Sequence, residues 1–548
     1  MSKPDDRTVY FHSAIARAMK DQGIDTVFGL IGDANLYMVD AFIREQQGRY
    51  IAAANEAGAV LMALGYASVT GKVGVATVTH GPAVTNTLTG LVEGVKAQLP
   101  MLLLCGDTSV EVRGHLQDCD QRALITDTGA GFEQLRAPST FSQDLAFALR
   151  RAVNERRPVA LNVPVDFQWQ EVVYRKVPAP PPPPMGRVPA GEAFDNAVGI
   201  IAAARRPIVL AGRGAIDPAA KAALIRLAAR IGAPLATTLR AKGLFNGETF
   251  DLGVHGTLSL GPAAEAIGGA DCLIAFGAGM NIFTSGLGAY VKNRRIVQCN
   301  TDPADLARVY PVDAALAGDP AAVAEAIVAA LDAAEIPASG FRTPELAEAL
   351  ASHSPLDGLP DMSTSTTVDA RRALHRLGKA VPADRTVVVD GGRFMGSTWQ
   401  FVDAPEPRAY VHTINFGSIG LGVAYAVGAA AGAPGRPALL VCGDGGFMLG
   451  GLTEFNTAVR HGLDLIVLLC NDSSYGAEHI QFRNKNMDPS LSVIAWPEFA
   501  RLARALGGEG VTVRTAADLA AAEAAIRNRK GPLLIDLKCD PDHMAPMF

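Results

Sequence analysis

The sequence predicts an α/β fold built from three doubly wound, mostly parallel β-sheets. Short apolar runs that end in glycine-rich or polar turns recur along the chain, and stretches with helical patterning separate them. The chain has 548 residues, which is too long for a single hydrophobic core. Two stretches of linker composition interrupt the alternation, so we expect three domains of this kind.

The two linkers set the predicted domain boundaries. Residues 178–189 begin with the proline run PAPPPPP, which favours extended backbone and offers few donors to a sheet. We expect a semi-rigid linker there rather than a docking motif for a proline-binding protein. Residues 341–365 are polar with scattered proline and serine, and form the second linker. The predicted domains therefore span residues 1–177, 190–340 and 366–548.

Apolar runs and helical patterns define the elements expected in the first domain. The predicted strands are Thr26–Leu30, Tyr50–Ala53, Gly74–Thr79, Met101–Cys105 and Pro158–Val163. The predicted helices are His12–Gln22, Glu56–Val69 and Leu88–Ala97. Uninterrupted apolar strands such as these are typical of a parallel sheet that is covered on both faces.

The second and third domains show the same alternation. The strands expected in the second are Pro207–Ala211, Pro234–Thr237, Cys272–Phe276 and Arg295–Cys299. Those expected in the third are Thr386–Val389, Ala438–Cys442, Leu465–Cys470 and Pro532–Leu537. Glycine turns at residues 212–214 and 277–279 lack the full G-x-G-x-x-G pattern, which favours simple turns over a dinucleotide site.

Composition argues against several classes of partner and site. The chain is 49% hydrophobic and 19% charged, with a net charge of −6 and no basic block, so neither nucleic acid nor an anionic membrane is expected. Its seven cysteines are scattered without CxxC pairs, which disfavours zinc or a disulfide framework and is typical of a reducing cytosol. The polar start is no signal peptide, and no apolar run is long enough to cross a membrane. We expect a cytoplasmic protein.

Residues 438–476 form the most informative stretch of the chain. They predict a strand, a glycine-rich turn, a helix and a second strand, with Asp444 and Asn471 just after the two strands. Open parallel sheets bind ligands at the carboxyl ends of their strands. A carboxylate and an amide oxygen suit Mg²⁺ or Ca²⁺ with a phosphate completing the shell, and the glycine-rich turn offers N–H groups to that phosphate.

This stretch carries a resemblance to a known family. G-D-G at residues 443–445 and N-D at 471–472 resemble the signature with which thiamine diphosphate enzymes hold Mg²⁺ and the diphosphate. With three comparable α/β units, essentially the whole chain resembles the thiamine diphosphate-dependent decarboxylase and carboligase superfamily, which includes acetohydroxyacid synthases, pyruvate decarboxylases and benzaldehyde lyase. The resemblance implies pyrimidine-binding, central and diphosphate-binding domains, in that order. It also implies active sites shared between the chains of a homodimer or homotetramer.

The resemblance also implies which residues bind the cofactor. Glu56, in NEAGA, matches the glutamate that hydrogen-bonds the aminopyrimidine and so promotes deprotonation at C2; the alternative role is a partner of the helix dipole. Ile419, in GSIG, matches the apolar residue beneath the thiazolium. Asp444, Asn471 and the backbone carbonyl of Ser473 match the metal ligands. Further expected cofactor contacts are Gly392, Arg393, Phe394, Ser418, Gly445, Gly446, Ser474, Tyr475 and Gly476.

The positions expected to face the substrate resemble different relatives. Asp33, in GDANL, and Glu478 resemble acid–base residues of pyruvate and indolepyruvate decarboxylases, whose adjacent histidine pair is missing here. Gln117 resembles the cofactor-facing glutamine of benzaldehyde lyase and acetohydroxyacid synthases. His80, in HGP, matches a cofactor-facing turn and would titrate near neutral pH; His115 is a weaker candidate. Each also has a structural alternative as a turn, cap, core or surface residue.

These features together predict a thiamine diphosphate- and Mg²⁺-dependent lyase or transferase. The favoured activity is acetolactate synthase-like: a 2-oxo acid loses CO₂ and the product is joined to an acceptor. The alternatives are simple decarboxylation and cleavage of a 2-hydroxy ketone or diketone. An oxidoreductase that binds FAD at the central glycine turns is less favoured, although FAD kept without redox turnover would be compatible with a synthase. A non-catalytic binding protein is disfavoured by Glu56, Asp444 and Asn471.

Overall fold

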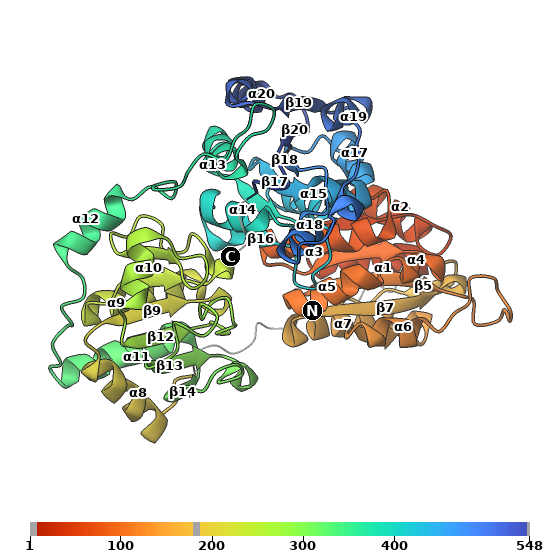
Figure 1. Cartoon of the computed structure of the whole chain (residues 1–548). Coiled ribbons are helices and arrows are strands. Elements are labelled where there is room, and N and C mark those ends of the chain that lie inside the picture. Colours follow the sequence, from red (N-terminus) through yellow and green to blue (C-terminus); the bar gives the residue numbers. More distant parts are fainter. Residues whose placement is uncertain (1–7, 179–186, 545–548) are drawn as a thin grey trace. The chain divides into compact units, whose positions relative to one another are not determined.

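The computed structural model describes residues 8–178 and 187–544 (Figure 1). The described chain divides into two compact units. The first unit contains residues 8–178, 362–395 and 411–544, and the second contains residues 187–361 and 396–410. The first unit therefore combines the two ends of the chain around two of the three sheets.

The first sheet has six parallel strands. Across the sheet they are β3 (Arg49–Ala52), β2 (Thr26–Gly29), β4 (Gly74–Val78), β5 (Met101–Asp107), β7 (Pro158–Pro164) and β6 (Gly131–Gln134). The helices are α1 (Phe11–Asp21), α2 (Leu36–Arg44), α3 (Glu56–Thr70), α4 (Pro82–Thr85), α5 (Leu88–Ala97), α6 (Gln121–Asp127) and α7 (Phe141–Glu155). β1 (Thr8–Tyr10) and β8 (Glu171–Val173) form a separate antiparallel pair.

The apolar run of β5 is buried because helices cover both faces of this sheet. Leu103 and Cys105 point into one hydrophobic cluster, and Leu102 and Leu104 into another. Successive side chains of a strand face opposite ways, so a strand in the middle of such a sheet must be apolar throughout.

The third sheet also belongs to the first unit, except for Tyr410 at the start of its edge strand. Its order is β16 (Tyr410–His412), β15 (Thr386–Val389), β17 (Ala438–Gly443), β18 (Leu465–Asn471), β20 (Leu533–Lys538) and β19 (Glu509–Val513), and β15 to β19 run parallel. Its helices are α13 (Ala370–Ala380), α15 (Gly422–Gly432), α16 (Asp444–Gly446), α17 (Leu452–Arg460), α18 (Gly476–Asn484), α19 (Phe499–Ala505) and α20 (Leu519–Asn528). A π-helical segment, Phe447–Gly451, joins α16 to α17.

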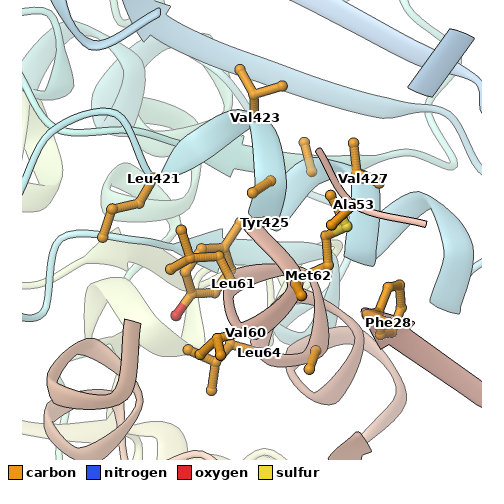
Figure 2. Packing of buried hydrophobic residues seen from close by; sticks show 14 of the residues in the cluster. Phe28, Ala53, Val60, Leu61, Met62, Leu64, Leu421, Val423, Tyr425 and Val427 are labelled. Carbon is orange, nitrogen blue, oxygen red and sulfur yellow. The ribbon is translucent and has the colours of Figure 1, made fainter. Parts of the chain in front are cut away.

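Helices α3 and α15 join the first and third sheets through one continuous core. A Cβ at Gly65 of α3 would collide with the carbonyl of Tyr425, and one at Gly428 of α15 with the carbonyl of Met62. The two backbones therefore approach more closely than larger residues would allow. Figure 2 shows Leu61 and Met62 packed with Tyr425 in this core.

The second unit holds the remaining sheet and its own core. The parallel strands are β11 (Asp251–Val254), β10 (Leu235–Thr237), β9 (Pro207–Ala211), β12 (Cys272–Phe276), β13 (Arg295–Asn300) and β14 (Ala314–Ala317). The helices are α8 (Glu192–Ala203), α9 (Pro218–Ile231), α10 (Gly261–Gly268), α11 (Pro320–Ala333) and α12 (Pro344–Ser352). Lys242 fixes residues 396–410, which include most of α14 (Met395–Phe401), by donating to the carbonyls of Trp399 and Val402.

The predicted fold class is confirmed, since the three large sheets each have six strands and are flanked by helices. Helix α12 lies inside the stretch expected to be the second linker, residues 341–365. Most of the expected proline-rich linker, residues 179–186, lies outside the described residues. No helix in the described ranges has the length and apolar character needed to cross a membrane.

Candidate active site

The carboxyl ends of β17 and β18 bring the predicted metal ligands together. Asp444 follows β17 directly and begins α16, whereas Asn471 is the last residue of β18. The backbone N–H of Ser473 donates to Asn471 Oδ1 at 3.2 Å, and its charge distribution also favours the ionised carboxylate of Asp444. Asn471 is itself fixed, because its Nδ2 donates to Asp536 at 2.8 Å.

One oxygen of Asp444 is buried without compensation. Oδ1 accepts the N–H of Gly445 at 2.7 Å, but the buried Oδ2 has no hydrogen-bond partner among the described residues. Burial, reinforced by the nearby charge of Asp472, raises the pKa of Asp444 to about 7. An ionised carboxylate in such a place requires a cation.

The donor set around Asp444 fits Mg²⁺ with a diphosphate. The described residues contain no group of three or more His, Cys, Asp or Glu side chains that would hold a metal. A cation here would instead use one carboxylate, the amide oxygen of Asn471 and a backbone carbonyl such as that of Ser473, whose φ of 54° belongs to a tight turn. So few protein ligands leave coordination positions for phosphate oxygens, which is how proteins usually hold Mg²⁺.

The glycines after Asp444 are required by close packing. A Cβ at Gly445 would lie 2.7 Å from the ring of Tyr475, and one at Gly446 would lie 3.1 Å from Asp390 Oδ2. Tyr475 follows Ser474, whose N–H and hydroxyl both donate to Asp472 Oδ1. Gly445, which follows β17, and Tyr475, which follows β18, are both predicted cofactor contacts, and they pack against each other.

Asp390 is a buried carboxylate at this edge that sequence reasoning missed. It follows β15, is 1% exposed, and accepts the N–H groups of Gly391 at 2.7 Å and Gly420 at 3.1 Å. Burial raises its pKa to about 6. Asp390 thereby holds the loop that carries Ser418 and Ile419. A single acidic residue directly after an apolar strand was the only sequence signal for it.

The remaining predicted contacts surround the ends of β15 and β17. A Cβ at Gly443 would lie 3.1 Å from the ring of Phe394, and one at Gly391 would lie 3.1 Å from Ile419 Cγ2. Gly392 has a φ of 150°, in the region that favours glycine, and a side chain there would strike Phe394. These contacts bring the loops with Phe394 and Ile419 to the same edge as Asp444.

Arg393 and Gly476 meet near the C-terminal segment. The buried guanidinium of Arg393 donates to the carbonyls of Pro541, at 2.6 Å, and Met544. A Cβ at Gly476 would lie 2.8 Å from Asp472 Oδ2 and 3.5 Å from Arg393 Cβ. Arg393 thus holds the backbone at Pro541 and Met544, while its Nε has no hydrogen-bond partner among the described residues.

Glu56 occupies the first position of α3, where Asn55 caps the helix. The Asn55 side chain accepts the N–H of Ala57 at 2.8 Å, and Glu56 Oε2 accepts Asn86 Nδ2 at 3.0 Å. Glu56 is partly buried. None of the hydrogen bonds found in the described ranges joins Glu56 to Asp444 or Asn471.

A second polar cluster lies at the carboxyl ends of β2 and β4. Asp33 Oδ1 accepts the hydroxyl of Thr79 at 2.6 Å and lies 3.8 Å from His80 Nδ1. The ring of His80 is 5.5 Å from that of His115, centroid to centroid, and the N–H of Gln117 donates to His115 Nδ1 at 3.2 Å. The cluster therefore unites Asp33, His80 and Gln117, and adds the weaker candidate His115.

His80 is the most buried member of this cluster. It is 1% exposed, and within the part of the chain that the structure describes its Nε2 has no hydrogen-bond partner. Burial lowers its pKa, although the charges of Asp33 and Asp107 act in the opposite direction. Glu478, the fifth predicted catalytic residue, is exposed in the first turn of α18 on the third sheet, outside this cluster.

The two glycine turns of the second unit already use their backbone N–H groups in hydrogen bonds. Gly212 donates its N–H to Phe276, Gly214 to Gly277 and Gly277 to Cys299, at 2.8 to 3.0 Å. A Cβ at Gly214 would lie 2.8 Å from Gly277 Cα. These N–H groups are thus already paired, which supports simple turns rather than a cradle for nucleotide phosphates.

Comparisons with known proteins agree with this geometry. Residues 11–124, 194–327 and 390–537 match the N-terminal TPP binding domain, the central domain and the C-terminal TPP binding domain of the thiamine pyrophosphate enzymes. The chain is 30% identical to the probable 2-ketoarginine decarboxylase AruI of Pseudomonas aeruginosa, over 97% of this chain and 94% of that protein.

Two further relatives have different names. Identity is 28% with the acetolactate synthase large subunit of Corynebacterium glutamicum, over 95% of this chain and 86% of that protein. It is 26% with a sulfoacetaldehyde acetyltransferase of Castellaniella defragrans, over 96% and 92% of the two chains. These relatives match nearly the whole chain and differ in the reaction for which they are named.

Proposed function

Because the chain belongs to the thiamine pyrophosphate enzyme family, we propose that it uses thiamine diphosphate and Mg²⁺ to decarboxylate a 2-oxo acid and join the product to an acceptor. The enzyme is a thiamine diphosphate-dependent lyase or transferase. The observation that carries the proposal is the unpaired, buried Oδ2 of Asp444 beside Asn471 and Ser473.

The residues of the third sheet would hold the cofactor at its diphosphate end. Asp444, Asn471 and the Ser473 carbonyl would bind Mg²⁺, and the diphosphate would lie near the glycine-rich turn that follows Asp444. Phe394 and Ile419, which lie at the same edge of the sheet, would supply apolar contacts to the cofactor. When bound, thiamine diphosphate supplies a nucleophilic carbon that also stabilises negative charge after loss of CO₂.

Proton transfer would fall to residues of the first sheet. Glu56 would hold a proton against the aminopyrimidine ring, and its partner Asn86 fixes one of its carboxylate oxygens. His80, with its unpaired Nε2 and lowered pKa, is neutral at pH 7 and suited to accept a proton there. Asp33, linked to His80 through Thr79, would stabilise the protonated imidazole.

We infer that each active site is shared between two chains of a homodimer or homotetramer. This assembly is what membership of the family implies. In such an assembly Glu56 of one chain would serve the cofactor held by its partner.

Simple decarboxylation is the second candidate. The Asp33–Thr79–His80 cluster, with His115 beside it, is an acid–base group that would favour protonation of the product and its release as an aldehyde. Gln117, which donates only its backbone N–H within the cluster, favours carboligation by its resemblance to synthases.

A substrate panel separates these activities. Pyruvate, branched and guanidino 2-oxo acids would be supplied alone and with a second 2-oxo acid or sulfoacetaldehyde, with thiamine diphosphate and Mg²⁺ present. Release of CO₂ and products identified by mass spectrometry would distinguish a ligated product from an aldehyde. Absence of cofactor binding by calorimetry would overturn the proposal.

Glu56→Gln tests the chemistry directly. Glutamine keeps the size of the side chain but cannot hold the proton, so we expect retained cofactor binding and a loss of turnover of roughly 100-fold or more. Steady-state kinetics and calorimetry measure the two effects separately. Unchanged turnover in this variant would exclude the proposed role of Glu56.

A further inference from the structure

A buried glutamate on a helix of the first domain holds the loop of the third domain that leads to Ile419. Glu93 lies on α5 and has 0% of its surface exposed. Its Oε1 accepts the backbone N–H of Asn415 at 3.2 Å and the Nδ2 of the same residue at 2.6 Å. Its Oε2 accepts the N–H of Phe416 at 2.7 Å. Asn415 and Phe416 lead directly into the loop that carries Ile419.

A buried glutamate on a helix of the third domain likewise holds the loop of the first domain that leads to Glu56. Glu454 lies on α17 and is 1% exposed. Its Oε1 accepts the backbone N–H groups of Ala54 at 3.2 Å and Asn55 at 3.1 Å. Its Oε2 accepts the hydroxyl of Thr457 at 2.7 Å and shares the N–H of Ala54, also at 3.2 Å. Ala54 and Asn55 are the two residues immediately before Glu56.

Two residues at the end of α17 also hydrogen-bond to the backbone that precedes Glu56. Arg460 donates to the carbonyl of Ala52 at 2.9 Å, and the N–H of Ala52 donates to His461 Nε2 at 3.1 Å. The fit is close at Gly58, where a Cβ would collide with Glu454 Oε1. The backbone from Ala52 to Gly58 is therefore held by helix α17, which begins after the metal loop.

Buried carboxylates are costly, so their use for these contacts is informative. A carboxylate removed from water is tolerated only when hydrogen bonds compensate it. An apolar side chain would fill the same volume without this cost but would leave the loop N–H groups unpaired and the loop free to shift. What Glu93 and Glu454 add over an apolar residue is the orientation of the two loops.

We propose that Glu93 and Glu454 are reciprocal positioning residues: each fixes, from the opposite domain, the loop that presents Ile419 or Glu56 to the cofactor. The inference rests on the proposed function, because it is the role of those two residues that gives the loops their importance. Neither glutamate is placed against the cofactor, and both act through backbone N–H groups.

Two substitutions of Glu454 test the proposal. Glu454→Ala removes the acceptor for Ala54 and Asn55, whereas Glu454→Gln keeps one oxygen that can accept both N–H groups. The decisive readout is the rate at which the C2 proton of bound thiamine diphosphate exchanges with deuterium, measured by NMR after acid quench. Since small displacements of catalytic groups cost about 100-fold, we expect that loss in exchange and in kcat for E454A, and recovery to within about 3-fold for E454Q.

Binding and stability measurements separate positioning from a general structural effect. Cofactor affinity, measured by calorimetry, should change by less than about 5-fold in E454A because Asp444, Asn471 and Ser473, the proposed Mg²⁺ ligands, are unchanged. Glu523→Gln is the matched control: Glu523 is a carboxylate of the same unit that pairs with Arg376 on its surface, and its loss should leave the exchange rate unchanged. If E454A does not fold, Glu93→Gln decides, because a single oxygen cannot serve both Asn415 and Phe416.

The outcomes are distinguishable from failure of the proposed function. A folded E454A that exchanges at the wild-type rate, while Glu56→Gln does not, would overturn the positioning role alone. Equal losses of exchange in E454A and E454Q would also overturn it, since the acceptor would not then matter. If Glu56→Gln itself exchanges normally, the proposed function fails instead.

Discussion

The carboxylates at the edge of the third sheet differ in how they are compensated. Asp390 accepts several backbone N–H groups, including those of Gly391 and Gly420, and Asp444 keeps one oxygen unpaired. Asp390 therefore serves the backbone, whereas Asp444 is suited to an external cation. Both have raised pKa values because burial disfavours the ionised form.

Asp390 should make the stability of the cofactor-free protein depend on pH. Its pKa is about 6 in the folded chain and about 3.9 when unfolded, so the folded state binds more protons in this range. Its contribution to the free energy of unfolding is complete below pH 4 and is lost as pH rises through 6. The asparagine of Asp390→Asn does not titrate, so the free energy of unfolding of this variant, relative to wild type, should rise by up to about 3 kcal/mol from pH 4 to pH 7. Urea unfolding at several pH values measures this; a constant difference would contradict it.

His80 should set an acidic limit to activity. Its pKa is lowered from the usual value by burial, so protonation becomes significant only below about pH 6.5. His80→Gln keeps a polar side chain but cannot transfer a proton, and we expect roughly 100-fold lower kcat/KM and no acidic limb in its pH profile. The pH dependence of kcat/KM for both proteins provides the measurement. An unchanged acidic limb in the variant would assign it to another group.

At the scale of elements, the contact between α3 and α15 should be intolerant of any added atom. Gly428→Ala would drive its methyl group into the Met62 carbonyl, and backbone cannot yield as a flexible side chain can. We expect a loss of about 1–3 kcal/mol in the free energy of unfolding. Gly199→Ala, in α8, is the control: its Cβ would meet nothing within 4 Å, so helix propensity should make it neutral or stabilising. Chemical denaturation of both variants would show whether the difference holds.

Elements with an unbroken apolar run were predictable from the sequence. β9, β12 and β15 have the predicted bounds, because central strands must be apolar on both faces. β6 and β19, which lie at sheet edges, were not predicted. Their sequences, GFEQ and EGVTV, mix polar and apolar residues, and only pairing with β7 and β20 makes them strands.

The candidate site was predictable where spacing along the chain carries the chemistry. The loops that begin at Asp444 and Asn471 follow two adjacent parallel strands, so the order of the elements along the chain is enough to bring them together. Glu93 and Glu454 had no such signal, because each is a single acidic residue on a helix whose partner loop is hundreds of residues away. The pairing of His80 with His115 likewise depends on how two loops meet.

At the scale of the whole molecule, sharing of active sites between chains can be tested by mixing inactive variants. Glu56→Gln and Asp444→Asn should each be inactive alone. When dimers re-form from an equal mixture, half are mixed and one of their two sites contains neither substitution, so about a quarter of the wild-type activity should return. Activity measured before and after subunit exchange provides the test. If each site is built from a single chain, no activity will return.

The reciprocal contacts of Glu93 and Glu454 limit how this enzyme can be recombined with its relatives. A domain transferred alone into another member of the family would bring its own glutamate but would depend on the recipient for the one that holds its loop. The first and third domains should therefore be exchanged as a pair, and libraries that cross over between them need to carry residues 52–58 with α17, and residues 415–420 with α5. To keep activity, the first and third domains then have to be transferred together, even though each has a complete sheet of its own.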